Sequence, residues 1–137
     1  MKRNHWKDQF KLIESASNFH NEVREIFVSD PFWNRFKCYQ EVSVKDLVPD
    51  YPTRQHHFDW FIVELNTIVE LHGAQHYGIV NYGNIGYEDI RLQAIGIAQR
   101  DHAKKTAAIK HGYIYKVIKF NHAGKLNGER LKSLILE

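Results

Sequence analysis

The sequence predicts a single α/β domain whose elements follow the order α-β-β-β-α-β-α. Runs rich in β-branched and aromatic residues lie between segments with helical periodicity, and the two central runs are apolar on both faces. Apolar residues on both faces are typical of a central strand that is covered from both sides. At 137 residues the chain is long enough for a real core but too short for a sizeable second domain. We therefore expect one domain over residues 1–137.

The first predicted elements are a helix and a strand. Helical periodicity covers about residues 6–27 with a break near 15–17, and the Ser-Asp-Pro sequence at 29–31 ends it. A strand follows near residues 39–44, and a loop rich in Asp, Pro and Arg then covers residues 46–55. The apolar face of the helix is formed by Phe19, Val23, Ile26 and Phe27.

A β-hairpin is predicted next. The runs His57–Leu65 and Ile68–His72 flank a short connection at Asn66-Thr67. Asn-Thr is weaker turn chemistry than Asn-Gly, so a turn at Leu65-Asn66 is an alternative. One apolar face would hold Phe58, Trp60 and Ile62, and the other Phe61, Val63, Leu65 and Ile68.

The last predicted elements are two helices with a strand between them. Residues 73–86 are rich in Gly, Tyr and Asn and are not expected to be regular. A long helix covers Glu88–His111, and Gly112 is a good signal for its C-terminal end. A buried strand over Tyr113–Phe120 and an amphipathic helix over Lys125–Leu136 complete the chain.

Pairing parity in the hairpin brings candidate metal ligands together. Either turn pairs residues whose numbers sum to an odd number, and directly opposed side chains share a face, so Asp59 lies on the face of Glu70 and His72. Two nearby carboxylates are costly without a cation between them, and oxygen ligands suit Mg²⁺. A polar strand residue is usually only solvent-facing, but the apolar neighbours here favour a site at the edge of the core.

These residues also resemble a known motif. Asp59, ten intervening residues, Glu70, one residue and then a basic group is similar to the PD-(D/E)XK nuclease superfamily, with His72 in the position of the usual Lys. The pair His72-Gly73 with a further histidine, His76, resembles the very-short-patch repair endonucleases and phage homing-endonuclease catalytic domains that carry a Glu…Asp…His…Asp pattern. The resemblance covers about residues 22–120. Phe58 stands where the superfamily has Pro, and no run of Cys and His follows Gly73.

The resemblance implies a fold and an activity for the single domain. The fold would be a mixed β-sheet flanked by helices on both sides, the restriction-endonuclease-like core. The activity would be Mg²⁺-dependent endonuclease cleavage that nicks or cuts duplex or branched DNA, with Mn²⁺ as a substitute. Asp59, Glu70 and the backbone carbonyl of Leu71 would hold the metal, and His72 would orient or deprotonate the attacking water or stabilise the pentavalent phosphate.

Further site residues are expected from the two longest helices. Asp101 lies at helical spacing from a stripe that should face the sheet, formed by Ala94, Ile97, Ala98, Lys105 and Ala108. The resemblance favours Asp101 as a carboxylate of the site; the alternative is a surface ion pair with Lys104 or Lys105. It also implies an acid from the first helix, where Glu22 is preferred over Glu25, although an ordinary solvent-edge Glu is an equal alternative.

Basic residues are the remaining site candidates. The net charge is +3, and most of the basic excess follows Arg100. A basic half attached to a carboxylate cluster suits a phosphodiester substrate, although a solvated face is the common alternative. We expect Arg54, Arg100, Lys104 and Lys105 to contact DNA. His76 would lie at the mouth of the site as a general base or a phosphate contact, unless it is an ordinary surface histidine.

Composition limits the class of protein. The single cysteine, Cys38, excludes an internal disulfide framework and a zinc site built from cysteines. The N-terminal MKRNHWKDQF has no signal-peptide pattern and no run approaches a membrane span, so we expect a cytoplasmic protein. The sequence is also compatible with a homodimer. Two alternatives stay open for the function: the same chemistry on RNA or junction substrates, and a catalytically inactive nuclease-fold module that binds DNA.

Overall fold

In the part of the chain that the structure describes, four strands form one mixed sheet in the order β1-β2-β3-β4. The computed structural model describes residues 18–73 and 87–137. Strands β1 and β2 and strands β2 and β3 pair antiparallel, whereas β3 and β4 pair parallel. The α/β class and the mixed sheet agree with the sequence prediction. The elements in chain order are α1 (Asn18–Ser29), β1 (Cys38–Ser43), α2 (Val44–Leu47), β2 (His57–Ile62), the 3₁₀ turn η2 (Val63–Leu65), β3 (Thr67–His72), α3 (Tyr87–Lys110), β4 (Ile114–Lys119), the 3₁₀ turn η4 (Phe120–His122) and α4 (Gly128–Leu136).

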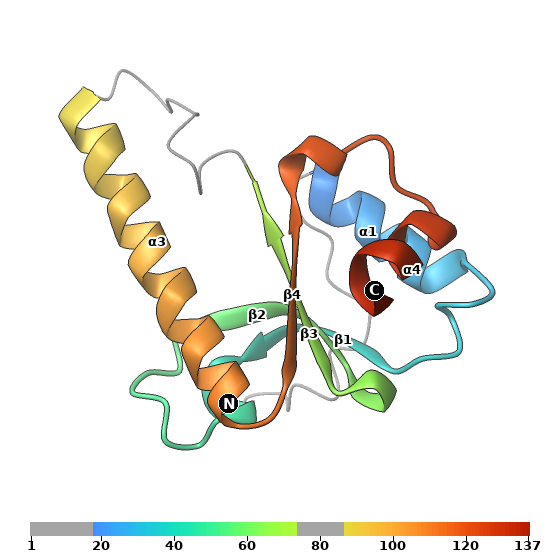
Figure 1. Ribbon diagram of the computed structural model, residues 1–137, viewed down its shortest axis with the longest axis horizontal. Helices are drawn as coiled ribbons and strands as arrows, with labels where there is room; N and C mark the ends of the chain where they lie inside the picture. Colours follow the sequence, from blue (N-terminus) through green and yellow to red (C-terminus); the bar gives the residue numbers. More distant parts are fainter. Residues whose placement is uncertain (1–17, 74–86) are drawn as a thin grey trace, which may run out of the picture.

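Helices cover the sheet from two sides (Figure 1). Helices α1 and α4 lie together on one side, and α3 lies on the other. The core with α1 and α4 contains Phe19, Val23, Phe27, Trp33, Trp60, Ile62, Val69, Leu71, Ile118, Leu131 and Ile135. The core with α2 and α3 contains Val42, Val44, Val48, Tyr51, Phe58, Phe61, Ile68 and Ala108.

Helix α1 forms because its apolar residues repeat at helical spacing. Phe19, Val23 and Phe27 are buried, and each contributes roughly 1.5–3 kcal/mol by leaving water. The helix ends at Ser29, as predicted. The Asp30 carboxylate then accepts hydrogen bonds from the backbone N–H groups of Phe32 and Trp33, at 3.0 and 3.3 Å, and starts the next turn.

The predicted two-residue turn of the β2–β3 hairpin is wrong. Strand β2 ends at Ile62, and the 3₁₀ turn Val63–Leu65 and Asn66 in the left-handed region connect it to β3. Val63 is exposed, contrary to prediction. The observed pairs are Trp60 with Val69, Phe61 with Ile68 and Ile62 with Thr67. Their residue numbers still sum to an odd number, so the predicted sharing of faces survives the longer loop.

The pairing of β1 with β2 is irregular next to Asp59. Glu41 of β1 has a φ of 55° and lies where the regular pairing of β1 with β2 is interrupted. A left-handed residue inside a strand acts like a bulge and re-aims the side chains around it. Phe58 consequently packs in the core with α3, whereas Trp60 and Ile62 pack in the core with α1, so their predicted common face is wrong.

Helix α3 agrees with the predicted position, but its inward face differs from the prediction. The helix ends before Gly112, whose φ of 85° suits glycine. Lys105 and Ala98 are exposed, although the sequence stripe placed them inward. Of the predicted stripe, Ala108 is buried and Ile97 and Asp101 are half-buried, and Lys104 is buried in place of Lys105. The N-terminal part of α3 extends beyond the sheet (Figure 1).

The C-terminal elements also differ in detail. Strand β4 is an edge strand in which only Ile118 is buried, so the predicted buried strand is wrong. Helix α4 begins after Asn127, whose side chain accepts a hydrogen bond from the N–H of Arg130 at 2.8 Å. None of the helices within residues 18–73 and 87–137 is long and apolar enough to cross a membrane.

Candidate active site

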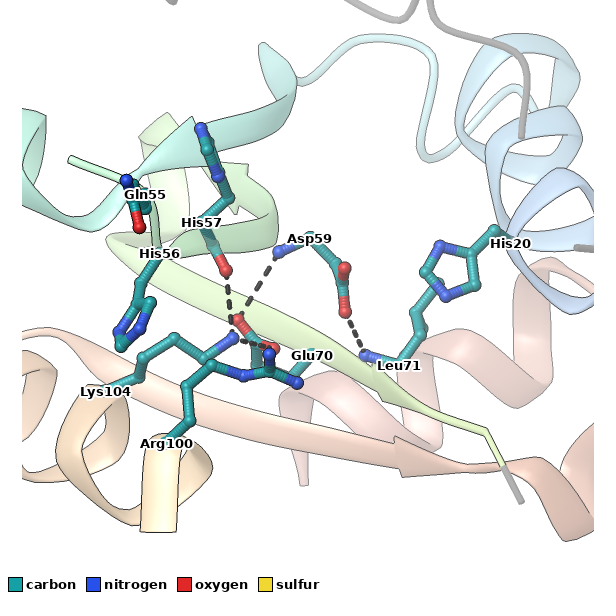
Figure 2. Close-up of a pocket in the computed structure, with 9 residues that line it drawn as sticks. All are labelled: His20, Gln55, His56, His57, Asp59, Glu70, Leu71, Arg100 and Lys104. Carbon is teal, nitrogen blue, oxygen red and sulfur yellow. Dashed lines mark hydrogen bonds and ion pairs between the residues drawn. The ribbon is translucent and has the colours of Figure 1, made fainter. Parts of the chain in front are cut away.

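A polar pocket of about 290 Å³ brings together residues from α1, β2, β3, α3 and the loop before β2 (Figure 2). Five of the residues predicted for the site, namely Asp59, Glu70, Leu71, Arg100 and Lys104, line it. His20, Gln55, His56 and His57 complete its lining.

Asp59 and Glu70 lie together, as pairing parity predicts. The backbone N–H of Leu71 donates to Asp59 Oδ2 at 2.7 Å, and the N–H of Asp59 donates to Glu70 Oε1 at 3.4 Å. The regular pairing of β2 with β3 ends one residue earlier, at Trp60 and Val69. The two carboxylates therefore bridge the strands where the backbone ladder stops, and the Leu71 contact fixes one oxygen of Asp59.

Glu70 forms a buried ion pair with Lys104 of α3. The two residues are 1% and 6% exposed, and Lys104 Nζ donates to Glu70 Oε2 and to the carbonyl oxygen of His57, both at 2.9 Å. Burial and then the charge of Asp59 raise the pKa of Glu70 to about 8, against the opposing effect of Lys104. Lys104, predicted to contact phosphates, is thus buried and lines the pocket, bound to Glu70, and its contact with phosphate stays a prediction. Both oxygens of Glu70 accept hydrogen bonds, Oε2 from Lys104 and Oε1 from the N–H of Asp59. Metal binding by Glu70 stays a prediction.

Glu41 and His20 are two potential metal ligands that were not among the predicted site residues. One potential ligand atom from each of His20, Glu41 and Asp59 lies within 4.8 Å of the other two. Glu41 lies opposite Asp59 in the register of β1 with β2, so aligning these two predicted strands would have found it. His20 carries no comparable signal, because its position depends on how α1 packs on the sheet.

The donor set of this cluster suits a divalent cation. Burial and then the charge of Asp59 raise the pKa of Glu41 to about 7, with Lys104 opposing. Burial, followed by the charges of Glu70, Asp101 and Asp59, also raises the pKa of Tyr115 on β4. These shifts share two causes, burial first and then the negative charge of neighbouring carboxylates, which Lys104 only partly offsets at Glu41. Two carboxylates and an imidazole around one point are ligands that Mg²⁺ and, with its greater tolerance of nitrogen, Mn²⁺ accept.

His72 and Asp101 form a second contact between β3 and α3. His72 Nε2 lies 3.7 Å from Asp101 Oδ2, and both side chains are largely buried. Asp101 thus faces the sheet, as predicted, and the alternative ion pair with Lys104 or Lys105 is not formed. His72 follows Glu70 by two residues on β3. In this contact the strand supplies the basic residue and the helix the acid, whereas in the Glu70–Lys104 pair the strand supplies the acid and the helix the base.

Glu22, predicted as a carboxylate of the site, binds backbone groups away from the pocket. Its Oε2 accepts a hydrogen bond from the N–H of Gly124 at 2.7 Å, and its Oε1 accepts one from the N–H of Leu126 at 2.9 Å. These backbone groups belong to the connection between β4 and α4. Glu22 therefore binds the β4–α4 connection to α1 and does not line the pocket.

The other predicted residues are distributed around the domain. Arg54 pairs with Asp46 at 2.7 Å in the connection between β1 and β2, and Lys105 is exposed on α3. Arg100 reaches the pocket from α3 (Figure 2). His76 lies outside the described residues.

Comparisons with family models, curated proteins and solved structures found no match to this chain. Any functional inference therefore depends on the residues of the pocket, their contacts and their charges. The resemblance to the PD-(D/E)XK pattern is likewise limited to the residues that carry it.

Proposed function

We propose that this protein is a divalent-metal-dependent nuclease that hydrolyses phosphodiester bonds in DNA. The observation that carries the proposal is the convergence of His20, Glu41 and Asp59 beside the buried Glu70–Lys104 pair. A surplus of carboxylates in a pocket is costly in the absence of a cation, so a function is a better explanation than stability.

The arrangement of the elements supports the same proposal. Asp59 lies on β2 opposite the left-handed Glu41 of β1, Glu70 lies on the neighbouring strand β3, and helices cover both sides of the mixed sheet. The PD-(D/E)XK resemblance implies a restriction-endonuclease-like core of this kind. Function still has to be argued from the site, because one fold serves many functions.

Asp59, Glu41 and His20 would hold Mg²⁺ or Mn²⁺, with Glu70 as a further predicted ligand. When bound, the ion supplies a Lewis acid that lowers the pKa of a water molecule and offsets phosphate charge. Asp59 is oriented for this role by the N–H of Leu71. Lys104 brings a positive charge next to the cluster, and Glu70 and the carbonyl of His57 hold its ammonium group in place.

Lys104 would supply the fixed positive charge that the usual Lys of the PD-(D/E)XK pattern provides, which leaves His72 for proton transfer. A cation fixed beside the scissile phosphate stabilises the negative charge that grows on the phosphoryl oxygens in the transition state. Hydrolysis adds water across the P–O bond: the water oxygen attacks phosphorus, its proton passes to a base, and the leaving oxygen takes up a proton. His72 is the proposed base, and Asp101 would support its protonated form.

A plasmid-nicking assay tests the proposal. Wild-type protein should nick supercoiled DNA with MgCl₂ or MnCl₂ and should not do so with EDTA. Asp59→Asn is the sharpest variant, because the amide oxygen can still accept the Leu71 hydrogen bond while the charge is lost. We expect its rate to fall at least about 100-fold, whereas Glu129→Gln, at an exposed position of α4, should match wild type.

The same assay separates the open alternatives. RNA and four-way-junction substrates, tested in parallel, determine the preferred nucleic acid. DNA binding without nicking of any substrate would contradict the proposal and favour an inactive binding module. Equal rates for Asp59→Asn and Glu129→Gln would contradict the assigned site.

A further inference from the structure

The two ends of the candidate active-site pocket differ in charge. Figure 2 shows His20 at one end and His56 at the other, with Asp59 and Glu70 between them. The His20 end holds the carboxylate cluster described above. At the His56 end, Arg100 enters from α3, and its guanidinium has no ion pair within the described parts of the chain.

His56 is held by a sheltered contact with Tyr51. The hydroxyl of Tyr51 lies 2.6 Å from Nδ1 of His56, and Tyr51 is only 5% exposed. A phenol is a stronger hydrogen-bond donor than a neutral imidazole N–H, and an imidazole nitrogen is the better acceptor. Tyr51 therefore donates to Nδ1, and the ring proton of His56 lies on Nε2. This leaves an N–H donor on the part of the ring that is not bound to Tyr51.

The surroundings keep His56 a neutral donor. Burial, and then the charges of Arg100, Lys104 and His57, lower the pKa of His56. A neutral imidazole with a fixed Nε2–H can bind an anion next to a permanent guanidinium without adding a charge of its own. Lys104 is already bound to Glu70, so Arg100 supplies the uncompensated charge at this end.

We propose that Arg100 and His56 form a subsite for a second phosphate of the substrate, and that Tyr51 is the positioning residue that fixes the tautomer of His56. The phosphate identity rests on the proposed function, because a nucleic-acid strand that places one phosphodiester at the carboxylate cluster brings neighbouring phosphates to the rest of the pocket. Arginine binds phosphate oxygens through two parallel N–H groups, and the Nε2–H of His56 adds a third donor.

Titration with inorganic phosphate in EDTA tests the subsite without metal and without catalysis. The ¹⁵N signals of the histidine rings report both phosphate binding and the tautomer of His56. Phosphate should shift the His56 signals, and Arg100→Gln should raise the Kd for phosphate about tenfold or more. Tyr51→Phe should change the tautomer distribution of His56 and raise the Kd about three- to tenfold.

Two matched variants serve as controls. Arg130→Gln removes an exposed arginine from α4, on the other side of the sheet, and should leave the Kd unchanged. Tyr113→Phe removes the hydroxyl of a tyrosine from the same core, where it donates to the carbonyl of Leu47, and should leave the His56 tautomer unchanged. Equal effects of Arg100→Gln and Arg130→Gln, or an unchanged His56 tautomer in Tyr51→Phe, would overturn the proposal, as would the absence of any phosphate effect on His56.

The source of the phosphate is resolved by a second titration in EDTA. Oligonucleotides with and without a 5′-phosphate compare a terminal phosphate with an internal one. If the wild type prefers the 5′-phosphorylated oligonucleotide and Arg100→Gln abolishes this preference, the subsite binds a terminal phosphate. If both oligonucleotides bind with equal affinity and Arg100→Gln weakens both, the subsite binds an internal phosphate. Phosphate binding at His56 in a protein that fails to nick any nucleic acid would contradict the proposed function and leave the anion subsite intact.

Discussion

Glu41→Gln should stabilise the metal-free protein above neutral pH. Burial and then the charge of Asp59 raise the pKa of Glu41 from 4.5 to about 7 in the folded state. Between these two values the folded protein binds more protons than the unfolded chain, so its stability falls as the pH rises. The favourable contribution is fully present below a pH of 4.5 and is lost as the pH rises through about 7.

The magnitude follows from the two pKa values. The change from 4.5 to about 7 corresponds to about 3 kcal/mol in the free energy of unfolding. The side chain is only partly buried, and screening by solvent reduces this figure to about 2 kcal/mol. For a domain of this length, such a gain raises the Tm by roughly 6 °C. Well below neutral pH the gain should shrink, because the folded wild-type carboxyl is already protonated.

Thermal unfolding followed by circular dichroism measures this effect. At alkaline pH in EDTA, Glu41→Gln should melt above wild type, and at acidic pH the two should nearly coincide. MgCl₂ should reverse the order, because the ion binds the ionised carboxylate and stabilises only the wild type. An unchanged Tm for Glu41→Gln in alkaline EDTA, or an equal Mg²⁺ effect on both proteins, would refute the reasoning. Glu129→Gln is the control, since its side chain is exposed and should show no such reversal.

Three other substitutions separate structural from catalytic roles. Glu22→Ala removes two backbone hydrogen bonds and should lower the free energy of unfolding by about 1–3 kcal/mol, while the nicking rate per folded molecule stays unchanged. Lys104→Met should lower the nicking rate by roughly 10²–10³-fold, whereas Lys105→Met, at an exposed position of the same helix, should not; equal rates would remove Lys104 from the site. Asp101→Asn should lower the nicking rate at least about tenfold and change the Tm little, and it should alter the pH profile of the nicking rate if His72 is the base. An unchanged rate and pH profile would mean that the His72–Asp101 contact has only a structural role.

The parts of the fold that the sequence predicted are those with local signals. The spacing of Phe19, Val23 and Phe27 locates α1, and Gly112 locates the end of α3. Asp59 and Glu70 could be placed on one face because loops of two and of four residues preserve the same pairing parity. That inference was therefore insensitive to the error in the turn.

The parts that the sequence did not predict depend on contacts between distant segments. Glu41 joins the site only when β1 is aligned with β2 across an intervening helix and loop. Lys104 and Lys105 differ by about 100° around a helix, so a small error in the rotation of α3 exchanges the buried residue for the exposed one. Phe58 packs on the side of α3, contrary to prediction, next to the place where Glu41 adopts a left-handed conformation. Glutamate rarely adopts this conformation, so the sequence carries no signal for it.

The position of Lys104 bears on how the motif is read. A nuclease site of the proposed kind needs a fixed cation beside Glu70, and physical chemistry does not require that the cation follow Glu70 by two residues. Helix α3 packs against β3 so that Lys104 reaches Glu70 from the helix, while His72, at the motif position, contacts Asp101 of the same helix. A positive charge can therefore be placed beside Glu70 either by a residue two positions later on the same strand or by a residue on the facing helix, as Lys104 is here. A pattern confined to one segment identifies only the first of them, so the departure at His72 does not by itself argue against catalysis.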